Sequence, residues 1–273
     1  VVGGNEADAE GFVTSSSLAQ LFDPETGEFT RLPDAPVGID HALLVAHEDR
    51  AYAVSGTSDF ERVSETWSLA PGEDAWREEQ PIPTARFSPT GGVIGDRLYV
   101  VGGNRSGEED DAEATMEIFD FERGTWETGP AMPTPRHHAS AAVIGDRLYV
   151  VGGRGTDDLS LPAVERFDPG TGEWEQLPDL PEGVGGPATV TADGELIVIA
   201  GGDDIGEEGI EPWVTGAVWA LGPEGDGWER LPNLEVPRHG HDAAIIDDEI
   251  YVIGGSPCAG YGFTGAVEAL QLG

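Results

Sequence analysis

The chain has 273 residues, of which 52 are Asp or Glu and only 14 are basic, so its formal net charge is −38. All of the basic residues are Arg. This balance excludes nucleic acid as a partner, because nucleic-acid binding needs a basic surface. No apolar run is long enough to cross a membrane as a helix, so we expect no membrane insertion.

The acidic residues are spread over the whole chain instead of forming one block. This distribution is typical of proteins from salt-adapted organisms, where dissolved ions screen the repulsion between surface carboxylates. We therefore predict a halophilic, acidic protein. The alternative is an acidic surface that recruits cations or a basic partner.

In chain order, one pattern recurs: an apolar strand, a Gly-Asp turn, a second strand with Tyr, and a Gly pair. Val93–Gly103 and Val143–Gly153 are nearly identical copies, and Val1–Gly4 is the tail of another. Looser copies cover residues 46–56, 192–202 and 246–255. Taking the second Gly of each copy gives positions 4, 56, 103, 153, 202 and 255. A repeat of about fifty residues built from strands is typical of a propeller blade.

Each unit divides into four predicted strands, called a to d. In residues 136–178 the strands are expected at 138–144, 148–151, 163–167 and 173–177. The c–d turn is Asp-Pro-Gly-Thr-Gly, in which Pro fixes φ and Gly accepts a positive φ. A Pro follows each strand d and ends it, because Pro cannot continue a ladder of hydrogen bonds.

Aromatic residues recur once per unit and predict packing between neighbouring sheets. The strand d series is Phe29, Trp76, Trp126, Trp174 and Trp228. The strand b series is Tyr52, Tyr99, Tyr149 and Tyr251, with Ile197 in the remaining place. No helix start follows the Gly pairs, so they do not indicate a phosphate-binding loop.

The predicted fold is all-β: one domain over residues 1–273, a six-bladed propeller of four-stranded antiparallel blades. The expected blades cover about 1–35, 36–84, 85–133, 134–182, 183–235 and 236–273. The first and last would be incomplete, and residues upstream of Val1 are expected to close the ring, since open sheet edges invite aggregation. A five-bladed ring with a spare piece is the alternative.

Several of these sequence motifs resemble those of the kelch-repeat family. They are the Gly pairs, the strand b Tyr, the strand d Trp, and Pro-Arg-His before strand a at Arg136 and Arg238. The resemblance runs from Val1 to Gly273. It implies a β-propeller, in a family that includes partner-binding scaffolds, carbohydrate-active proteins and a few metalloenzymes. In ligand-binding members the site lies on the face formed by the d–a connections and the b–c loops.

The few cationic groups of the chain concentrate on that face. The d–a connections carry Arg86, Arg136, Arg238, His41, His137, His138, His239 and His241, and the b–c loops add Asn104, Arg105 and Arg154. Arg presents a planar set of donors that suits carboxylate, sulfate and sugar oxygens. We predict that these residues bind a ligand. The alternative is structural, with each Arg bonded to nearby carbonyl or carboxylate oxygens.

Other chemistry has less support. His41 and His138 would approach the axis and offer metal ligands, and Asp203, Asp204, Glu207 and Glu208 offer oxygens for calcium. Cys258 and Tyr261 share one late loop, but no second channel Tyr completes the copper site that galactose oxidase, a kelch relative, uses. We predict no metal, no other cofactor and no catalytic residue.

The leading hypothesis is a non-catalytic kelch module that binds a protein or glycan as a monomeric domain of a longer chain. The alternative is a carbohydrate-active enzyme similar to sialic acid mutarotases, using the Arg and His residues. The single cysteine forms no internal disulfide and leaves the compartment unknown. The Asn104-Arg105-Ser106 sequon, in a predicted exposed loop, favours an exported protein.

Overall fold

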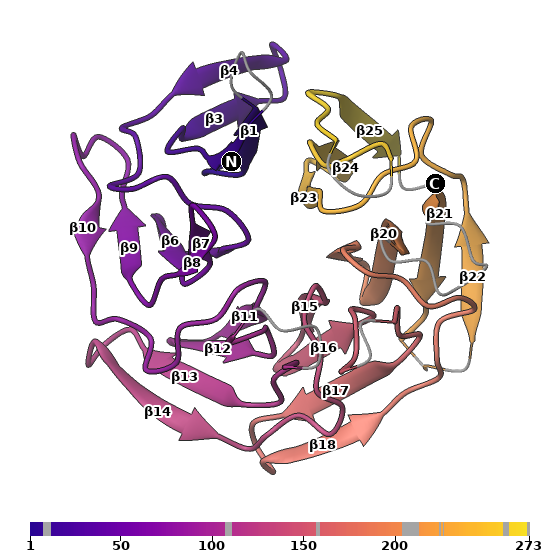
Figure 1. Ribbon diagram of the computed structural model, residues 1–273. Coiled ribbons are helices and arrows are strands. Elements are labelled where there is room, and N and C mark those ends of the chain that lie inside the picture. Colours follow the sequence, from indigo (N-terminus) through magenta and orange to yellow (C-terminus); the bar gives the residue numbers. More distant parts are fainter. Residues whose placement is uncertain are drawn as a thin grey trace.

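The computed structural model describes residues 1–7, 12–106, 111–156, 159–203, 213–223, 225, 227–258 and 262–271. Within these residues every regular element is a β-strand, and the sheets stand around a central axis like the blades of a propeller (Figure 1). No helix in the described part is long and apolar enough to cross a membrane. The all-β prediction is confirmed.

Five sheets of three or four antiparallel strands form the blades. Blade 1 contains β5 (Leu43–His47), β6 (Arg50–Val54), β9 (Thr66–Leu69) and β10 (Arg77–Glu78). Blade 2 contains β11 (Thr90–Ile94), β12 (Arg97–Val101), β13 (Met116–Asp120) and β14 (Thr125–Gly129). Blade 3 contains β15 (Ser140–Ile144), β16 (Arg147–Val151), β17 (Val164–Asp168) and β18 (Glu173–Gln176).

Blades 4 and 5 complete the series. Blade 4 contains β19 (Ala188–Ala192), β20 (Glu195–Asp203), β21 (Trp213–Leu221) and β22 (Trp228–Leu231). Blade 5 has three strands, β23 (Asp242–Ile246), β24 (Glu249–Ile253) and β25 (Val267–Gln271). In blades 1 to 4 the strands lie in the predicted order from a to d, and in blade 5 from a to c. In blade 3 their bounds fall within one or two residues of those expected for residues 136–178.

The prediction of six blades was wrong, and the alternative of a five-bladed ring with a spare piece is what the structure shows. Of the blade strands expected in the first repeat, only c and d form a sheet, the hairpin of β3 (Gln20–Asp23) and β4 (Glu28–Arg31). Before β3 the chain adds a single bridge between Val2 and Ala19, which is too little for a third strand. The hairpin lies between blades 1 and 5, and the ring of Phe22 packs 5.5 Å from that of Tyr251 in blade 5 (Figure 1).

Two short hairpins extend from the connections between strands b and c. One is β1 (Asn5–Ala7) with β2 (Val13–Ser15), and the other is β7 (Thr57–Ser58) with β8 (Glu61–Arg62) in blade 1. Hydrogen bonds between Ser15 and Asp59 join the two hairpins to each other. They therefore give this part of the ring more structured loops than a plain four-stranded repeat would have.

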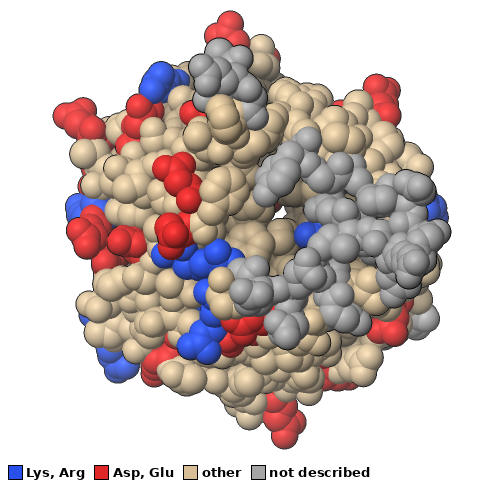
Figure 2. Space-filling view, viewed as in Figure 1, with Lys and Arg blue, Asp and Glu red and all other residues tan. Residues whose placement is uncertain are grey.

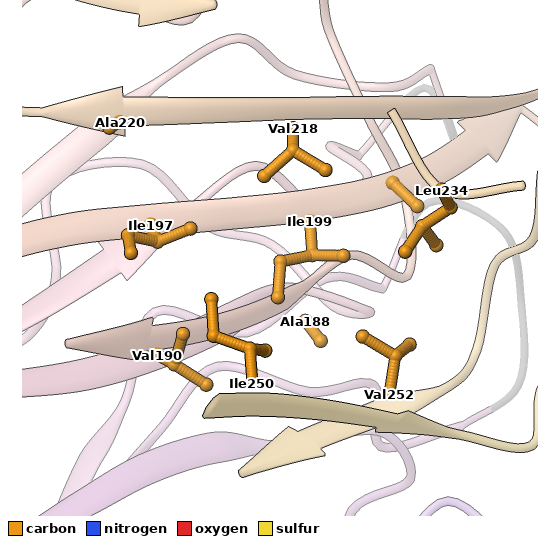
Figure 3. Close-up of a cluster of buried hydrophobic side chains, with 10 residues drawn as sticks. Ala188, Val190, Ile197, Ile199, Val218, Ala220, Leu234, Ile250 and Val252 are labelled. Carbon is orange, nitrogen blue, oxygen red and sulfur yellow. The ribbon is translucent and has the colours of Figure 1, made fainter. Parts of the chain in front are cut away.

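The core lies between the faces of neighbouring blades. Figure 3 shows one such layer, in which Ile197, Ile199 and Val218 of blade 4 meet Ile250 and Val252 of blade 5. Successive residues of a strand point to opposite faces, and in strand b successive residues are apolar, so Leu148 and Tyr149 enter different layers and blades 2, 3 and 4 pack on both sides. The strand b residues Tyr52, Tyr99, Tyr149 and Ile197 are buried in these layers, as predicted, whereas Tyr251 of blade 5 is only half-buried.

The strand d tryptophans bind each blade to the preceding unit. The indole Nε1–H of Trp126 donates to the carbonyl of Gln80, and that of Trp174 donates to the carbonyl of Pro130. Trp76 and Trp228 make the equivalent bonds to Pro33 and Pro178. The prediction that these aromatics pack between blades is confirmed, and their polar atoms fix the spacing of the outer strands.

The Gly pairs stand where one blade approaches the next. The N–H of Gly103 donates to the carbonyl of Arg136, and Gly102 has a φ of +71°, where a Cβ would lie 2.6 Å from that same oxygen. In blade 4 the equivalent bond comes from Gly201, not from Gly202 as the sequence spacing suggested. A bulge between Ile199 and Gly201 shifts the register, and Ala200 takes the left-handed place of the first Gly.

Candidate functional site

The d–a connections and the b–c loops meet at one end of the central channel. Single bridges join them in every blade: Asp40 with Thr57, Phe87 with Asn104, His137 with Arg154, Gly185 with Gly202, and His239 with Ser256. We call the end of the channel that these residues surround the mouth. Figure 2 shows the opening, with blue arginine atoms beside it over the region of β8 and red carboxylates mostly toward the rim.

A chain of backbone hydrogen bonds runs around the mouth from blade to blade. The N–H of Ser88 donates to the carbonyl of His41, that of His138 to Ser88, that of Gly186 to His138, and that of Gly240 to Gly186. All five residues have φ between +51° and +60°. Since three of them are not glycine, the left-handed turn is imposed by the bonds between blades and not by residue type.

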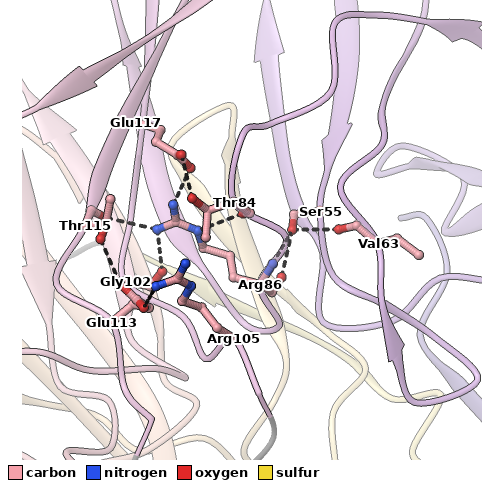
Figure 4. Close-up of polar contacts among 9 residues, drawn as sticks. All are labelled: Ser55, Val63, Thr84, Arg86, Gly102, Arg105, Glu113, Thr115 and Glu117. Carbon is pink, nitrogen blue, oxygen red and sulfur yellow. Dashed lines mark hydrogen bonds and ion pairs between the residues drawn. The ribbon is translucent and has the colours of Figure 1, made fainter.

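Arg86, predicted to bind a ligand, instead lies inside blade 2. Its side chain is 0% exposed, and its guanidinium forms an ion pair with Glu117 (Figure 4). Further bonds go to the carbonyls of Gly102 and Thr115, each at 2.9 Å. Burial lowers the pKa of Arg86, and the Glu117 carboxylate opposes that shift. Each of its three guanidinium nitrogens therefore donates within the protein.

Arg136 and Arg238 repeat this arrangement in blades 3 and 5. Arg136 pairs with Glu165 and Arg238 with Glu268, and both arginine side chains are 0% exposed. Each also donates to two carbonyls of its own blade. The geometry therefore contradicts the prediction that Arg86, Arg136 and Arg238 bind a ligand, because burial keeps all three from the mouth. The alternative, in which each Arg bonds to nearby carbonyl and carboxylate oxygens, is what the structure shows for these three residues.

Blades 1 and 4 fill the same place with apolar residues. The counterparts of the arginines are Ile39 and Val184, whose carbonyls accept the inter-blade bonds from Gly4 and Gly153. The strand c counterparts of the glutamates are Trp67 and Trp219, by strand register. Ile39 and Trp67 belong to one apolar cluster, and Trp219 packs against the cluster that contains Val184.

Three of the predicted histidines do come together at the mouth, around Phe87. The ring of His41 lies 4.8 Å from Phe87 and 5.3 Å from His138, both edge-on. His137 and His138 share a hydrogen bond of 2.6 Å between their Nδ1 atoms. Burial and the neighbouring Arg154 guanidinium hold the pKa of His138 well below its ordinary value, so its imidazole is neutral at pH 7.

Asp40 fixes the orientation of His41. Its carboxylate accepts hydrogen bonds from the Nδ1–H of His41 and the hydroxyls of Ser15 and Thr57. Burial alone would raise the pKa of Asp40, but these donors outweigh it, and the pKa lies below its ordinary value. The arrangement leaves the other ring nitrogen of His41 as the atom that a ligand could meet.

Arg62, on β8, is the functional candidate that sequence reasoning missed. Its guanidinium carbon lies 5.2 Å from the centre of the Phe87 ring, and its terminal nitrogens donate to Phe60 O at 3.1 Å and Asn104 Oδ1 at 3.3 Å. These partners are neutral, whereas most described arginines pair with a carboxylate. Its Nε is buried with no hydrogen-bond partner in the described part of the chain. The sequence feature that could have indicated Arg62 is its position in a b–c connection, although it lies outside the Pro-Arg-His motif.

The remaining candidates occupy mixed positions. Asn104 is only 2% exposed, so the prediction of an exposed sequon is wrong for the folded chain. Arg105 is more than half exposed and pairs with Glu113 at 3.0 Å. Arg154 is buried beside the mouth, where it bridges to His137.

His239 and His241 lie on the blade 5 side. The ring nitrogen Nε2 of His239 is 3.1 Å from the carbonyl oxygen of Cys258. His241 is buried against Ile199, to whose carbonyl its Nε2–H donates, and burial with the nearby Arg238 lowers its pKa to about 3. Of the two, only His239 borders the mouth directly, through its bridge to Ser256.

Among the described residues, no group of three or more His, Cys, Asp or Glu side chains is arranged to hold a metal ion. Of the residues considered for calcium, Asp204, Glu207 and Glu208 lie outside the described residues, as does Tyr261. The described mouth is therefore a mixture of aromatic rings, imidazoles and guanidinium groups, which suits binding of an anionic or planar group.

Comparisons with known proteins agree with this architecture. Residues 78–255 match the family model described as the KLHDC2/KLHL20/DRC7 Kelch-repeats domain. The fold and this match define a kelch-repeat β-propeller, and the chain belongs to the kelch-repeat family, as predicted.

Curated relatives include the Kelch repeat and BTB domain-containing protein 13 of Homo sapiens, 31% identical over 235 residues, covering 79% of this chain and 49% of that protein. Kelch-like protein terF of Aspergillus terreus is 26% identical over 214 residues, covering 74% and 46%. Kelch-like protein 15 of Danio rerio is 25% identical over 255 residues, covering 93% and 36%. The chain spans half or less of the length of these relatives.

Proposed function

We propose that this propeller is a non-catalytic binding module that recognises a protein or glycan ligand at the mouth. The observation that carries the proposal is the position of Arg62 over Phe87, next to the rings of His41 and His138. Arg62 bonds to neutral oxygens, whereas most described arginines of this chain, whose net charge is −38, pair with a carboxylate. It provides a local attraction for a carboxylate or another anionic group.

The relatives' names support a protein ligand. They pair a kelch region with other named parts, such as the BTB domain of the human relative and the F-box of an Arabidopsis thaliana protein. A kelch propeller beside a second domain fits a scaffold that brings a bound protein to that domain. By the same reasoning we propose that this propeller acts as a monomeric domain of a longer chain.

The proposal is tested with two arrays, one of immobilised glycans including sialic acids and one of acidic and neutral peptides. Wild-type protein is expected to bind members of at least one array, and Phe87→Ala should reduce that binding by about tenfold or more, as for a central aromatic contact. The matched control is Phe29→Ala, which removes a ring from the outer strand β4. Equal binding by wild type and Phe87→Ala would refute a site at the mouth.

A second candidate function is a carbohydrate-active enzyme, and the Asp40–His41 pair is the observation that favours it. A carboxylate bound to Nδ1 leaves Nε2 available to accept a proton from a substrate, which is the arrangement of a general base. Exchange between the anomers of free sialic acid, followed by NMR, tests this function. Catalysis that is lost in His41→Gln and kept in His47→Gln would support it, and exchange at the buffer rate would exclude it for this substrate.

A further inference from the structure

The hairpin β7–β8 beside the mouth has an unusual turn. Its two turn residues are Asp59 and Phe60, with φ of +47° and +71°. Two-residue hairpin turns with both φ values positive strongly favour Asn-Gly or Asp-Gly, because a side chain on the second residue is strained in the left-handed region. Phe60 occupies the position where glycine would be expected.

Burial of the Phe60 ring compensates little for this strain. Phe60 is 60% exposed, among the highest values for a large apolar residue of the described chain. Phe12, which immediately precedes β2 of the adjoining hairpin, is also strongly exposed at 66%. Strained residues persist where the surroundings hold them, and they are enriched at binding sites.

The hairpin is held firmly in place. The N–H of Asp59 donates to Ser15 Oγ at 2.8 Å, and Ser15 N–H donates to Asp59 Oδ1 at 3.4 Å. The carbonyl of Phe60 accepts a hydrogen bond from Arg62, which in turn lies over Phe87. The exposed ring and the arginine thus belong to one hydrogen-bonded turn, connected through the backbone of Phe60.

We propose that Phe60 and Arg62 together form a recognition element for a protein partner: Phe60 packs against an apolar side chain, and Arg62 binds a neighbouring carboxylate. This inference rests on the proposed function and names the ligand class for the same mouth. Aromatic and arginine residues dominate the binding energy of protein interfaces. The exposed ring supplies the apolar contact and the guanidinium supplies a charged donor for Asp or Glu.

A protein segment fits this surface better than a glycan. Sugar recognition needs polar groups that are available for hydrogen bonds, but Ser15 and Asp59 already bond to each other around the turn. A peptide with an acidic residue next to an apolar one satisfies both halves of the element.

The test uses immobilised peptides that carry one Asp or Glu next to one Leu, Ile or Phe. Two matched sets replace the acid by Asn or Gln, or the apolar residue by Ser. Wild-type protein is expected to bind the acid–apolar set about tenfold more tightly than either matched set, as for loss of one interface anchor. Failure of wild type to prefer the acid–apolar set would refute the proposal.

The decisive variant is Phe60→Gly, because glycine suits the turn. It should weaken binding of the acid–apolar peptides about tenfold while the melting temperature stays the same or rises, since the left-handed strain is relieved. Arg62→Gln should weaken binding of the acidic peptides and leave the weak binding of the Gln-matched set unchanged. Leu21→Ser and Arg31→Gln, on the hairpin β3–β4, are the matched controls and should bind as wild type.

The outcomes separate this inference from the proposed function. If Phe87→Ala loses peptide binding and Phe60→Gly keeps it, the mouth binds ligand but the turn is not the recognition element. If wild type binds only glycans, the assignment of a protein partner is wrong while the mouth remains a site. If Phe87→Ala binds as wild type on both arrays, both proposals are wrong.

Discussion

Blades 2, 3 and 5 differ from blades 1 and 4 at one buried place between the start of strand a and strand c. In blades 2, 3 and 5 an arginine and a glutamate form an ion pair, such as Arg136 with Glu165. In blades 1 and 4 an aliphatic residue and a tryptophan stand there, Ile39 with Trp67 and Val184 with Trp219. The backbone bonds around this place are otherwise alike.

The difference shows that the place must be filled as a matched pair. A buried charge is costly unless its partner and its hydrogen bonds are present, whereas a well-packed apolar pair of similar volume serves equally well. No described blade mixes the two solutions by putting an arginine opposite a tryptophan or an aliphatic residue opposite a glutamate. We therefore expect that changing one residue of a pair lowers the free energy of unfolding strongly, and that changing both residues together lowers it little.

The largest expected effect is that of breaking one ion pair. Glu165→Ala leaves Arg136 charged and buried, and should lower the free energy of unfolding by about 3–5 kcal/mol, the usual cost of an uncompensated buried charge. Urea denaturation in molar KCl measures it. Glu175→Ala, an exposed residue of the same blade, is the control. A loss below about 1 kcal/mol would show that water reaches the arginine. The conclusion that this place requires a matched pair would then be wrong.

Replacing the ion pair of blade 3 by the apolar pair of blade 4 should recover most of the lost free energy of unfolding. The double variant Arg136→Val with Glu165→Trp is expected to unfold within about 2 kcal/mol of wild type, while each single change costs about 3–5 kcal/mol. A double-mutant cycle therefore gives a coupling energy of several kcal/mol in favour of the matched pair. Additive losses would mean that Val184 and Trp219 depend on features of blade 4 that blade 3 lacks.

Acid should destabilise the blade 5 side through His241, which is buried near Arg238. Its pKa is about 3 in the folded chain and 6.5 when unfolded, so between these values the unfolded state binds more protons and stability falls as the pH falls. Lowering the pH from 7 to 5 should remove about 2 kcal/mol at this residue.

His241→Gln should remove this part of the pH dependence, and unfolding curves at pH 7, 6 and 5 measure it. The control is His47→Gln, at the far end of the strands. If His241→Gln loses stability with acid as steeply as wild type does, then another group carries the dependence, and the low pKa assigned to His241 is wrong.

The smallest expected effect is at an exposed pair. Arg31 and Asp34 form an ion pair with the arginine side chain 68% exposed, and Arg31→Gln should cost less than about 1 kcal/mol in dilute buffer and nothing measurable in molar KCl. The cost of Glu165→Ala should be similar in both salts, because the interior pair is shielded from ions. A salt-sensitive Glu165→Ala would remove the distinction between interior and surface pairs.

Salt adaptation itself stays a prediction. If it is correct, wild-type protein should gain stability steadily as KCl is added, since screening relieves the repulsion among its 52 carboxylates. Stability that is indifferent to KCl would favour the alternative of a surface that binds cations or a basic partner.

Much of the fold could be predicted from the sequence, because the repeated features are local. The Gly pairs, the strand b tyrosines and the strand d tryptophans each mark one place in the blade, and Trp126 and Tyr99 lie where the pattern put them. The bulge before Gly201 could not be predicted, because Ala200 adopts a left-handed conformation that its residue type does not signal.

The candidate site was predicted only in outline. The face and the histidine cluster around His41 and His138 were expected, but Arg86 and its counterparts were placed at the mouth when they lie inside their blades. Position along the chain locates a residue at the end of a strand but does not tell which way its side chain points. The partner glutamates lie about thirty residues later in strand c, so the sequence shows no direct sign of the pairing.

The sequence by itself determined that strands repeat with a fixed period and pack as radial sheets, because Gly pairs, turn residues and aromatic positions are short-range signals. Only the tertiary structure decided that five blades are built while the first repeat stays a hairpin, and that Arg62 instead of Arg136 faces the mouth. The physical reason is that a charged side chain takes the direction in which its charge is best compensated, and that compensation comes from residues brought together only by folding.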